Sequence, residues 1–357
     1  MLKIIDKKHR IIESRMNEID IVSEGYKEYF GAKDIQITAL PQSGSDRKYF
    51  RINDGNKSVI GAYNANPEEN DAFIGFTNQF LSKGLPVPEI YGSLPEKYVY
   101  FLRDLGDINL FTWLQHNGFK SEAEGFYRKV LDKLINFQID GIKGLNLDLC
   151  YPHKSFDRQS MMWDMNYFKY MLLKLLAAPF NERRLENDFN AMADFLLETG
   201  QDYFLYRDFQ SANVMVVDGE PWFIDYQGGR KGAPQYDVAS LLYDAKAHIP
   251  DASRNRLLDY HVDNFCAVSG EKPEEFRGYY AGFSMIRLMQ ALGAFGFRGL
   301  YEKKPTFTGS IVPAVILLKG IIDSGNLPVD LPELFSAVRG IPGTEVYREL
   351  ERTAENR

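Results

Sequence analysis

Three polar side chains at fixed spacing are the residues of this sequence best suited to chemistry. Asp208 is followed five positions later by Asn213, and a short apolar stretch then leads to Asp225. The stretch 214–224 has the pattern of a β-hairpin, two short apolar runs joined by an Asp-Gly turn. Closing this hairpin would place Asn213 beside Asp225 at its open end, with Asp208 in the loop that enters the first strand.

The chemistry that these residue types favour is phosphoryl transfer. An amide oxygen and a carboxylate side by side suit a hard cation such as Mg²⁺, which binds oxygen ligands and nucleotide phosphates. A separate carboxylate nearby suits a base that accepts a hydroxyl proton. Each residue alone would be an ordinary turn or capping residue. Their coincidence with a hairpin of the right length indicates a kinase-like site.

Composition excludes several other classes of protein. The chain has 357 residues, which favours two lobes over one small core. Its net charge of −7 leaves no basic footprint, so nucleic acid is not an expected partner. A Walker phosphate loop, GxGxxG, HExxH and GxSxG are all missing from the sequence. P-loop, Rossmann, zincin and hydrolase functions therefore lack their signatures.

Cysteine usage and hydropathy suggest a cytoplasmic protein. Cys150 and Cys266 lie far apart, without metal-binding spacing, and no signal peptide is evident, so we expect reduced thiols. The longest apolar run, 311–322, contains Pro313 and Lys319. It is too short to cross a bilayer, and no membrane partner is expected.

The elements that must position the polar residues fall into two groups. Residues 1–30 predict a polar helical lead-in. Strand patterns then occupy 35–40, 49–52, 59–63, 90–91 and 98–102, and a helix with apolar residues at helical spacing covers 70–83. From residue 109 onward apolar stripes at helical spacing dominate, interrupted by the hairpin.

This order predicts an α+β, two-lobed, protein-kinase-like fold. Residues 31–104 would form a small antiparallel β-sheet lobe with one helix, which binds nucleotide. Residues 105–357 would form a larger, mainly helical lobe for catalysis and substrate binding.

The catalytic segment carries a family resemblance. LYRDFQSANVMV followed by FIDYQ resembles the aminoglycoside phosphotransferase and choline kinase superfamily. Within it, the chain is most similar to the bacterial anomeric kinases of N-acetylmuramate and N-acetylglucosamine. Four further segments support that narrower match: GSDRKYFRI at 44–52, FLRDLGD at 101–107, GAPQYDVASLLYDA at 232–245 and RLMQALGAFGFRGL at 287–300.

The resemblance implies roles for individual residues. Asp208 would be the catalytic base, and Asn213 and Asp225 would hold Mg²⁺ against the phosphates of ATP. A loop would close over those phosphates with its backbone N–H groups, and a hinge would bind the adenine through backbone groups. The loop residues are Ser43, Gly44 and Ser45, and the hinge residues are Leu102, Arg103, Asp104 and Leu105.

Two departures from the superfamily pattern affect these expectations. The third strand has no Lys to hold the phosphates, a gap that the anomeric sugar kinases share. Arg47 and Lys48 are candidates to replace it, although solvated surface charges are the favoured interpretation. The helix partner of such a cation would be Glu68 or Glu69. Tyr206 stands where the superfamily has His, and we expect it to support the loop by packing and one hydroxyl hydrogen bond.

Five weaker candidates for substrate contact lie near the base or in the segment expected to border the acceptor: Arg207, Gln210, Gln227, Asp157 and Asp164. Surface or capping roles are open alternatives for the last two. Asp237 is expected to cap a helix and brace the catalytic loop.

The predicted reaction transfers the γ-phosphoryl group of ATP to a small-molecule hydroxyl, with the anomeric hydroxyl of an N-acetylated amino sugar favoured. An aminoglycoside, a choline-like compound or another small alcohol is an alternative acceptor, and a cationic one should need an acidic pocket. A degenerate kinase that binds nucleotide or a partner as a regulator is a further alternative, against which the intact Asp208, Asn213 and Asp225 argue. The acceptor, the preference for ATP over GTP and the oligomeric state stay open.

Overall fold

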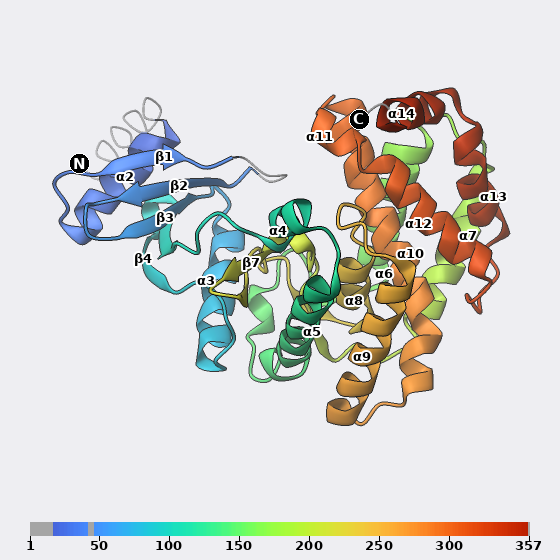
Figure 1. Cartoon of the computed structure of the whole chain (residues 1–357), viewed down its shortest axis with the longest axis horizontal. Helices are drawn as coiled ribbons and strands as arrows, with labels where there is room; N and C mark the ends of the chain where they lie inside the picture. The colour runs from blue at the N-terminus through green and yellow to red at the C-terminus, as the bar shows by residue number, and fades with distance from the viewer. Residues whose placement is uncertain (1–16, 42–45, 356–357) are drawn as a thin grey trace, which may run out of the picture.

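The computed structural model describes residues 17–41 and 46–355, which form a smaller sheet-containing lobe beside a larger helical region (Figure 1). This architecture confirms the predicted α+β, two-lobed fold. Most of the predicted lead-in, residues 1–16, lies outside the described residues, as does the 42–45 loop.

The smaller lobe is built on one antiparallel sheet whose strands follow the predicted positions. Its order is β1-β2-β3-β5-β4, and each neighbouring pair is antiparallel. The strands are β1 Gln36–Ala39, β2 Lys48–Asn53, β3 Ser58–Tyr63, β4 Ile90–Leu94 and β5 Val99–Arg103.

Helices cover both faces of this sheet, because successive side chains of a strand point to opposite sides. In β3, Val59 packs in one core cluster with residues of α2 (Glu18–Phe30). Its neighbour Ile60 packs in another cluster with residues of α3 (Pro67–Ser82). The side chain of Asn66 caps α3 by accepting the N–H of Glu69, so the helix begins at this point beside the sheet.

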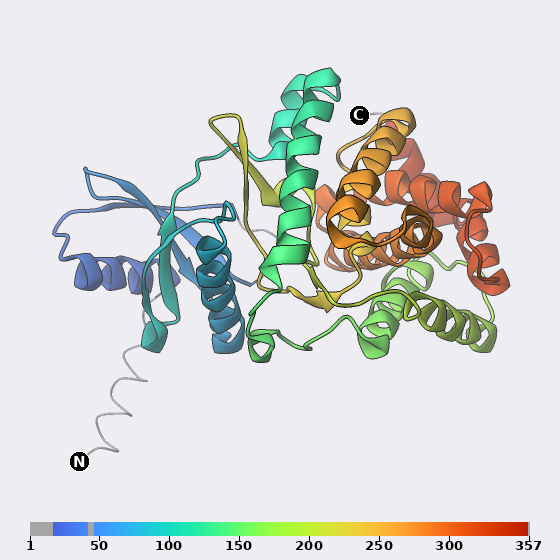
Figure 2. The same cartoon turned by 90° about the horizontal axis from the view of Figure 1, so that it is seen from below.

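The larger region is mainly helical, as predicted. Its helices are α4 Leu110–Asn117, α5 Ser121–Asn136, α6 Arg158–Phe168, α7 Glu182–Leu196, α8 Gln235–Leu242, α9 Asp251–Ser269, α10 Pro273–Phe295, α11 Pro305–Thr308, α12 Ile311–Ser324, α13 Pro332–Gly340 and α14 Glu345–Glu355. Helix α10 lies at the centre of this region and packs against α6, α8 and α12 (Figures 1 and 2).

Two short antiparallel ribbons lie between the sheet lobe and the helices. One pairs β6 (Tyr203–Leu205) with β9 (Arg230–Gly232), and the other pairs β7 (Val214–Val217) with β8 (Glu220–Phe223). The second ribbon is the predicted hairpin. Asp218 and Gly219 turn it with φ of 52° and 77°, the left-handed backbone that a tight two-residue turn requires.

One apolar segment is longer than its sequence suggested. Among the described residues, Pro305–Ser324 alone is long and apolar enough to cross a membrane by length and composition, because α11 extends the run that ends with α12. A buried core helix meets the same criterion. Most apolar side chains of α12 pack in this way, in the core cluster that it shares with α10 and α13, whereas Ile316 is exposed.

The close packing of α10 gives the first testable prediction. A Cβ at Gly296, just beyond its end, would lie 1.9 Å from the carbonyl oxygen of Met171. Gly296→Ala should therefore destabilise the protein by roughly 1–3 kcal/mol, the usual cost of overpacking. Thermal or urea unfolding would measure this change.

Gly278, on the same helix, is the matched control. A Cβ there would meet no described atom within 4 Å, and the residue is exposed. Gly278→Ala should raise stability by roughly 0.5–1 kcal/mol, because alanine loses less backbone entropy in a helix. Equal unfolding midpoints for the two variants would contradict the described packing of α10.

Candidate active site

The hairpin brings together the three residues singled out in the sequence. The Asn213 side-chain nitrogen donates to the backbone carbonyl of Asp208 at 2.9 Å and to the Asp225 carboxylate at 3.2 Å. The Ile224 N–H donates to the Asn213 carbonyl and closes the open end of the hairpin. Asp208 keeps a side chain that is 42% exposed, so its carboxylate is accessible to a substrate.

Asn213 and Asp225 fit a hard divalent cation. The amide nitrogen of Asn213 is committed to its two acceptors, which leaves metal binding to the amide oxygen. Desolvation raises the pKa of Asp225, and the negative charge of Asp208 raises it further. A bound cation would relieve both effects. No cluster of three His, Cys, Asp or Glu side chains in the described part of the chain could hold a metal, so nucleotide oxygens would complete the shell.

Two residues of the site have a backbone conformation that non-glycine residues rarely adopt. Arg207 has φ 84° and Asp225 has φ 69°. Such conformations cost about 1–3 kcal/mol each and persist only where neighbouring contacts hold them. The loop before the base and the end of the hairpin must therefore be held by residues elsewhere in the fold.

Asp237 provides one of these contacts. Its buried carboxylate accepts the backbone N–H of Tyr206 at 2.6 Å and that of Arg207 at 3.0 Å. Burial raises the pKa of Asp237 to about 7, and the two N–H donors limit the rise. The predicted bracing role is confirmed, but the predicted cap is wrong. Asp237 lies in the first turn of α8, and the capping position is Pro234. The Asp237 carboxylate does not cap the helix because it accepts N–H groups of the catalytic loop.

Tyr206 supports the loop as predicted. Its side chain is fully buried, and its hydroxyl donates to the carbonyl of Ile224 at 2.7 Å. The rings of Phe137 and Phe209 pack edge-on against it. Tyr206 therefore links the loop that carries the base to the end of the hairpin.

Arg207 and Asp164, two of the predicted substrate contacts, bind one another. The guanidinium makes two hydrogen bonds to the carboxylate, at 2.7 and 2.6 Å, and a third to the Tyr236 hydroxyl. Asp157 caps α6 by accepting the Ser160 N–H at 2.9 Å. These contacts explain how α6 and α8 hold the loop in its strained conformation. Substrate binding by the three charged residues stays a prediction.

The two predicted glutamine contacts lie at the hairpin end and at a small cavity. Gln227 donates from its side chain to the Asp225 carboxylate at 2.8 Å and so orients it. Gln210 lines a small cavity beside the base, together with Arg287.

Sequence reasoning missed Arg287. This residue lies on α10, 79 positions beyond the base, and its guanidinium is 3.9 Å from the Asp208 carboxylate. Hydrogen bonds to the side chains of Ser240 and Gln290 hold it there. The segment RLMQALG that contains it shows the family resemblance, but nothing in its spacing indicates that it reaches the base.

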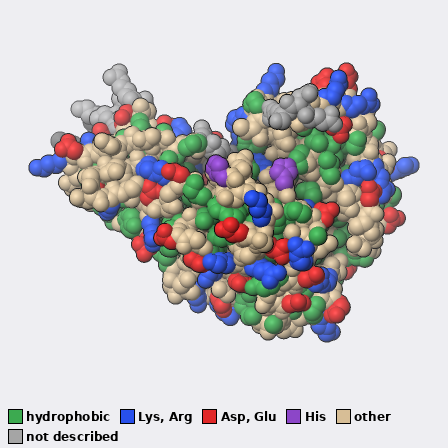
Figure 3. Space-filling model, viewed as in Figure 1, with side chains coloured by type: hydrophobic (Ala, Val, Ile, Leu, Met, Phe, Trp, Pro, Cys, Tyr) green, Lys and Arg blue, Asp and Glu red, His purple; other side chains and the backbone are tan. Residues whose placement is uncertain are grey.

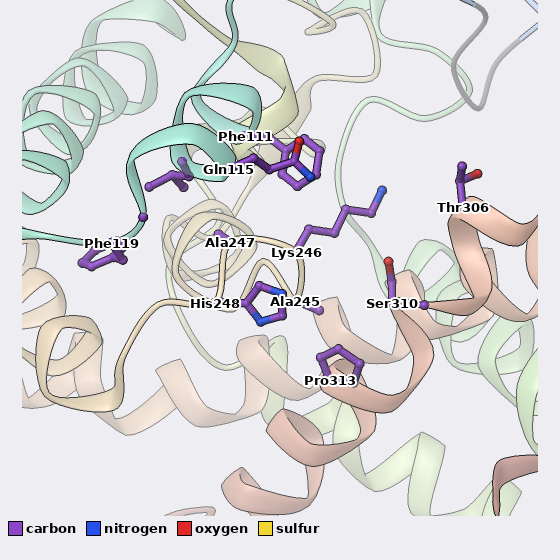
Figure 4. A pocket seen from close by; sticks show the side chains of 13 residues that line it. Phe111, Gln115, Phe119, Ala245, Lys246, Ala247, His248, Thr306, Ser310 and Pro313 are labelled. Carbon is purple, nitrogen blue, oxygen red and sulfur yellow. The ribbon is translucent and has the colours of Figure 1, made fainter. Parts of the chain in front are cut away.

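A larger cavity of about 600 Å³ opens next to the small one, and both are lined by Ala245. Its walls come from α4, the loop after α8, and α11–α12 (Figure 4). Lys246 extends across this cavity toward Thr306, and His248 lies on the wall below it. Its lining residues include a lysine and a histidine but no carboxylate. The molecular surface is notched where the sheet lobe meets the helical region (Figure 3).

On the nucleotide side, the structure describes only part of the predicted site. Ser43, Gly44 and Ser45 lie outside the described residues. In the hinge, Leu102 is buried, Arg103 lies over the Trp222 ring, and the Asp104 side chain binds Arg51. Adenine binding by the backbone of residues 102–105 stays a prediction.

The favoured interpretation of Arg47 as a solvated surface charge is wrong. The residue is 2% exposed, and its guanidinium pairs with Glu69 of α3 at 3.0 Å. The neighbouring Tyr49 and Phe73 enclose it, which is why the surface prediction is wrong. Lys48 does lie at the surface and pairs with Glu18.

The family model for the phosphotransferase enzyme family matches residues 36–279, more than half of the chain. The chain belongs to this family. The phosphotransferase is 23% identical, over 87% of its length and 92% of the relative's, to the N-acetylmuramate/N-acetylglucosamine kinase of Pseudomonas aeruginosa. It is also 23% identical to the kinase of the same name from Neisseria meningitidis serogroup B, over 76% of its length and 80% of the relative's.

Solved structures confirm the fold of this phosphotransferase. Choline kinase LicA from Streptococcus pneumoniae has a TM-score of 0.58 at 13% identity and covers 85% of this chain and 98% of its own. An amicoumacin kinase in complex with AMP-PNP, Ca²⁺ and amicoumacin has a TM-score of 0.58 at 12% identity, covering 91% and 99%. The match to the family model confirms the predicted resemblance to the superfamily of aminoglycoside phosphotransferases and choline kinases.

The raised pKa of Asp237 predicts a pH dependence of stability. Its native pKa of about 7 exceeds the value of ~3.9 in an unfolded chain, so the native state binds the proton more tightly. Its contribution to the free energy of unfolding must then fall as pH rises from about 4 to 7 and stay level beyond.

Asp237→Asn should lower stability overall, because it replaces one carboxylate oxygen that accepts an N–H, and should flatten the curve between pH 4 and 7. The expected flattening is on the order of a few kcal/mol, measured by urea unfolding at each pH. Asp218→Asn, in the exposed hairpin turn, controls for the loss of a carboxylate. A variant curve parallel to wild type would refute the shifted titration of Asp237.

Proposed function

We propose that this phosphotransferase is a small-molecule kinase that transfers the γ-phosphoryl group of ATP to a hydroxyl. The favoured acceptor is the anomeric hydroxyl of an N-acetylated amino sugar. The observation that carries the proposal is the junction of Asp208, Asn213 and Asp225, in which an exposed carboxylate lies beside a pair of oxygen ligands.

Asp208 is the base in this proposal. Its accessible carboxylate would orient the acceptor hydroxyl and take its proton as the phosphoryl group arrives, a contribution of roughly 10²- to 10⁴-fold. An anomeric hydroxyl is more acidic than an ordinary alcohol, so a carboxylate is a sufficient base. Asn213 and Asp225 would hold Mg²⁺, which supplies positive charge to the phosphate oxygens.

Two features support ATP as the donor: the predicted hinge at residues 102–105 and the similarity of the fold to a kinase solved with an ATP analogue. The amicoumacin kinase was solved with the ATP analogue AMP-PNP, which supports a nucleotide as the donor. Here residues 102–105 lead from β5 of the sheet lobe toward α4 of the helical region, and backbone recognition there would suit a purine base. The sequence and fold leave ATP and GTP equally compatible with such recognition.

The larger cavity, whose lining includes Lys246 and no carboxylate, favours a neutral or acidic acceptor over a cationic one. Lys246 extends across that cavity. Arg287 lies next to Asp208, and the lining of the smaller cavity, to which it belongs, also includes Asp244. An aminoglycoside or a choline-like compound is positively charged and would need acidic walls instead. The names of the two curated relatives support an N-acetylated sugar, and N-acetylmuramate carries a carboxylate that Lys246 could meet.

The base and the metal-binding pair give the decisive test of this proposal. Asp208→Asn should lower kcat by roughly 10²- to 10⁴-fold. Asp225→Asn should reduce kcat more than Asn213→Ala does, because it removes a charge from the metal shell. ³¹P NMR with Mg-ATP and a sugar panel that includes N-acetylglucosamine and N-acetylmuramate would detect a sugar 1-phosphate.

Asp218→Asn is the control, since it makes the same chemical change in the exposed turn of the same hairpin. Wild-type turnover by the Asp208, Asn213 and Asp225 variants would refute the assignment of the site. Turnover of another hydroxyl compound, but of no sugar, would move the proposal to a different acceptor. Nucleotide binding without turnover of any acceptor would favour a regulatory role.

The cavity charge predicts a difference between the two sugars. Lys246→Gln should raise KM for N-acetylmuramate about tenfold, a loss of ~1.4 kcal/mol, and should leave KM for N-acetylglucosamine close to wild type. Lys319→Gln, on α12 and paired there with Asp323, is the control. An equal change of KM for both sugars would show that Lys246 does not contact the acidic group.

A further inference from the structure

The cation buried in the sheet lobe is Arg47, at the entry to β2. Its guanidinium lies 3.0 Å from Glu69, in the first turn of α3. Protein kinases pair a glutamate of the corresponding helix with a lysine of the third strand, and that lysine binds nucleotide phosphates. Here the glutamate is present, but the third strand supplies no lysine to it.

The register of the sheet explains where Arg47 reaches. Tyr49 of β2 lies directly opposite Ala62 of β3, so their side chains share a face of the sheet. The Arg47 guanidinium lies 3.4 Å from the Tyr49 hydroxyl and therefore on that face as well. Ala62 is fully buried in the cluster that contains α3 residues, and its small side chain leaves room for the guanidinium.

The guanidinium also faces the predicted metal pair. It lies 4.0 Å from the Asp225 carboxylate, so it connects α3 to the end of the catalytic hairpin. Within residues 17–41 and 46–355, its Nε and Nη2 are buried and make no hydrogen bond, although Nη2 lies in the ion pair with Glu69. Buried donors call for an acceptor. The Nη1 of the same guanidinium is the atom that faces Asp225, beside which the phosphates are expected.

We propose that Arg47, positioned by Glu69, binds the nucleotide phosphates and takes the place of the strand lysine. The inference rests on the proposed function and names a residue that performs part of it. Arginine suits the position because its planar fork can bind a carboxylate and a phosphate oxygen at once. A lysine reaching from β2 would offer only one point of charge.

A purely structural ion pair is the competing explanation, and the ligand distinguishes the two. Arg47→Met keeps most of the side-chain length and removes the charge. If Arg47 binds phosphate, the variant should bind ADP and AMP-PNP about 10- to 100-fold more weakly in calorimetry, yet bind adenosine as wild type does. A structural role would weaken all three ligands alike, or lower the unfolding temperature without changing affinity, and either result would overturn the proposal.

Relocating the charge is the sharper test. The double variant Arg47→Met/Ala62→Lys places a lysine on the third strand, opposite Tyr49 and within reach of Glu69. We expect it to recover at least tenfold of the kcat/KM for ATP that Arg47→Met loses, with little change in KM for the acceptor. Lys48→Met, at the adjacent surface position, is the matched control and should match wild type.

The outcome separates this inference from the proposed kinase activity. If wild type binds ADP with an affinity that depends on Arg47 but phosphorylates no acceptor, the phosphate-binding role stands and the kinase proposal fails. If wild type phosphorylates a sugar and Arg47→Met retains both kcat and KM for ATP, the kinase proposal stands and the role of Arg47 is refuted.

Discussion

The contact on which the catalytic site depends is the pair of hydrogen bonds from the backbone of Tyr206 and Arg207 to the buried carboxylate of Asp237. Arg207 has a left-handed backbone conformation, which is unfavourable for a non-glycine residue unless neighbouring contacts hold it. A carboxylate that accepts two consecutive N–H groups fixes the direction of the chain just before Asp208. The cost is a buried charge, visible in the raised pKa of Asp237.

Around this contact the helices act as a frame for the loop. Asp164 of α6 accepts hydrogen bonds from the Arg207 guanidinium. The Tyr206 hydroxyl donates to Ile224 and so connects the loop to the end of the hairpin. Arg287 of α10 then approaches the base itself. The base thus receives its position from elements far apart in sequence, whereas the oxygen ligands receive theirs from one local hairpin.

That difference explains how much of the site could be predicted. The hairpin, its turn and the proximity of Asn213 to Asp225 follow from short-range pattern, and the structure confirms them. The roles of Asp164 and Arg287 could not be foreseen, because they depend on how α6 and α10 pack, 43 and 79 residues from their partners. Arg47 was assigned to the surface because charged side chains are usually solvated. The sequence does not show that Tyr49 and Phe73 enclose this one.

The fold alone does not determine which acceptor the protein uses. Choline kinase LicA shares the two-lobed fold with this chain at 13% identity, so the arrangement of lobes does not select a substrate. Selection must come from side chains around the cavities, which in this chain belong to α4, the loop after α8, and α10–α12. The larger cavity presents Lys246 and no carboxylate, so a permanent cation there would meet like charge in a confined space, where repulsion is screened less than in open water. The smaller cavity presents both Arg287 and Asp244. The proposal of a neutral or acidic acceptor therefore rests on the larger cavity and not on the fold.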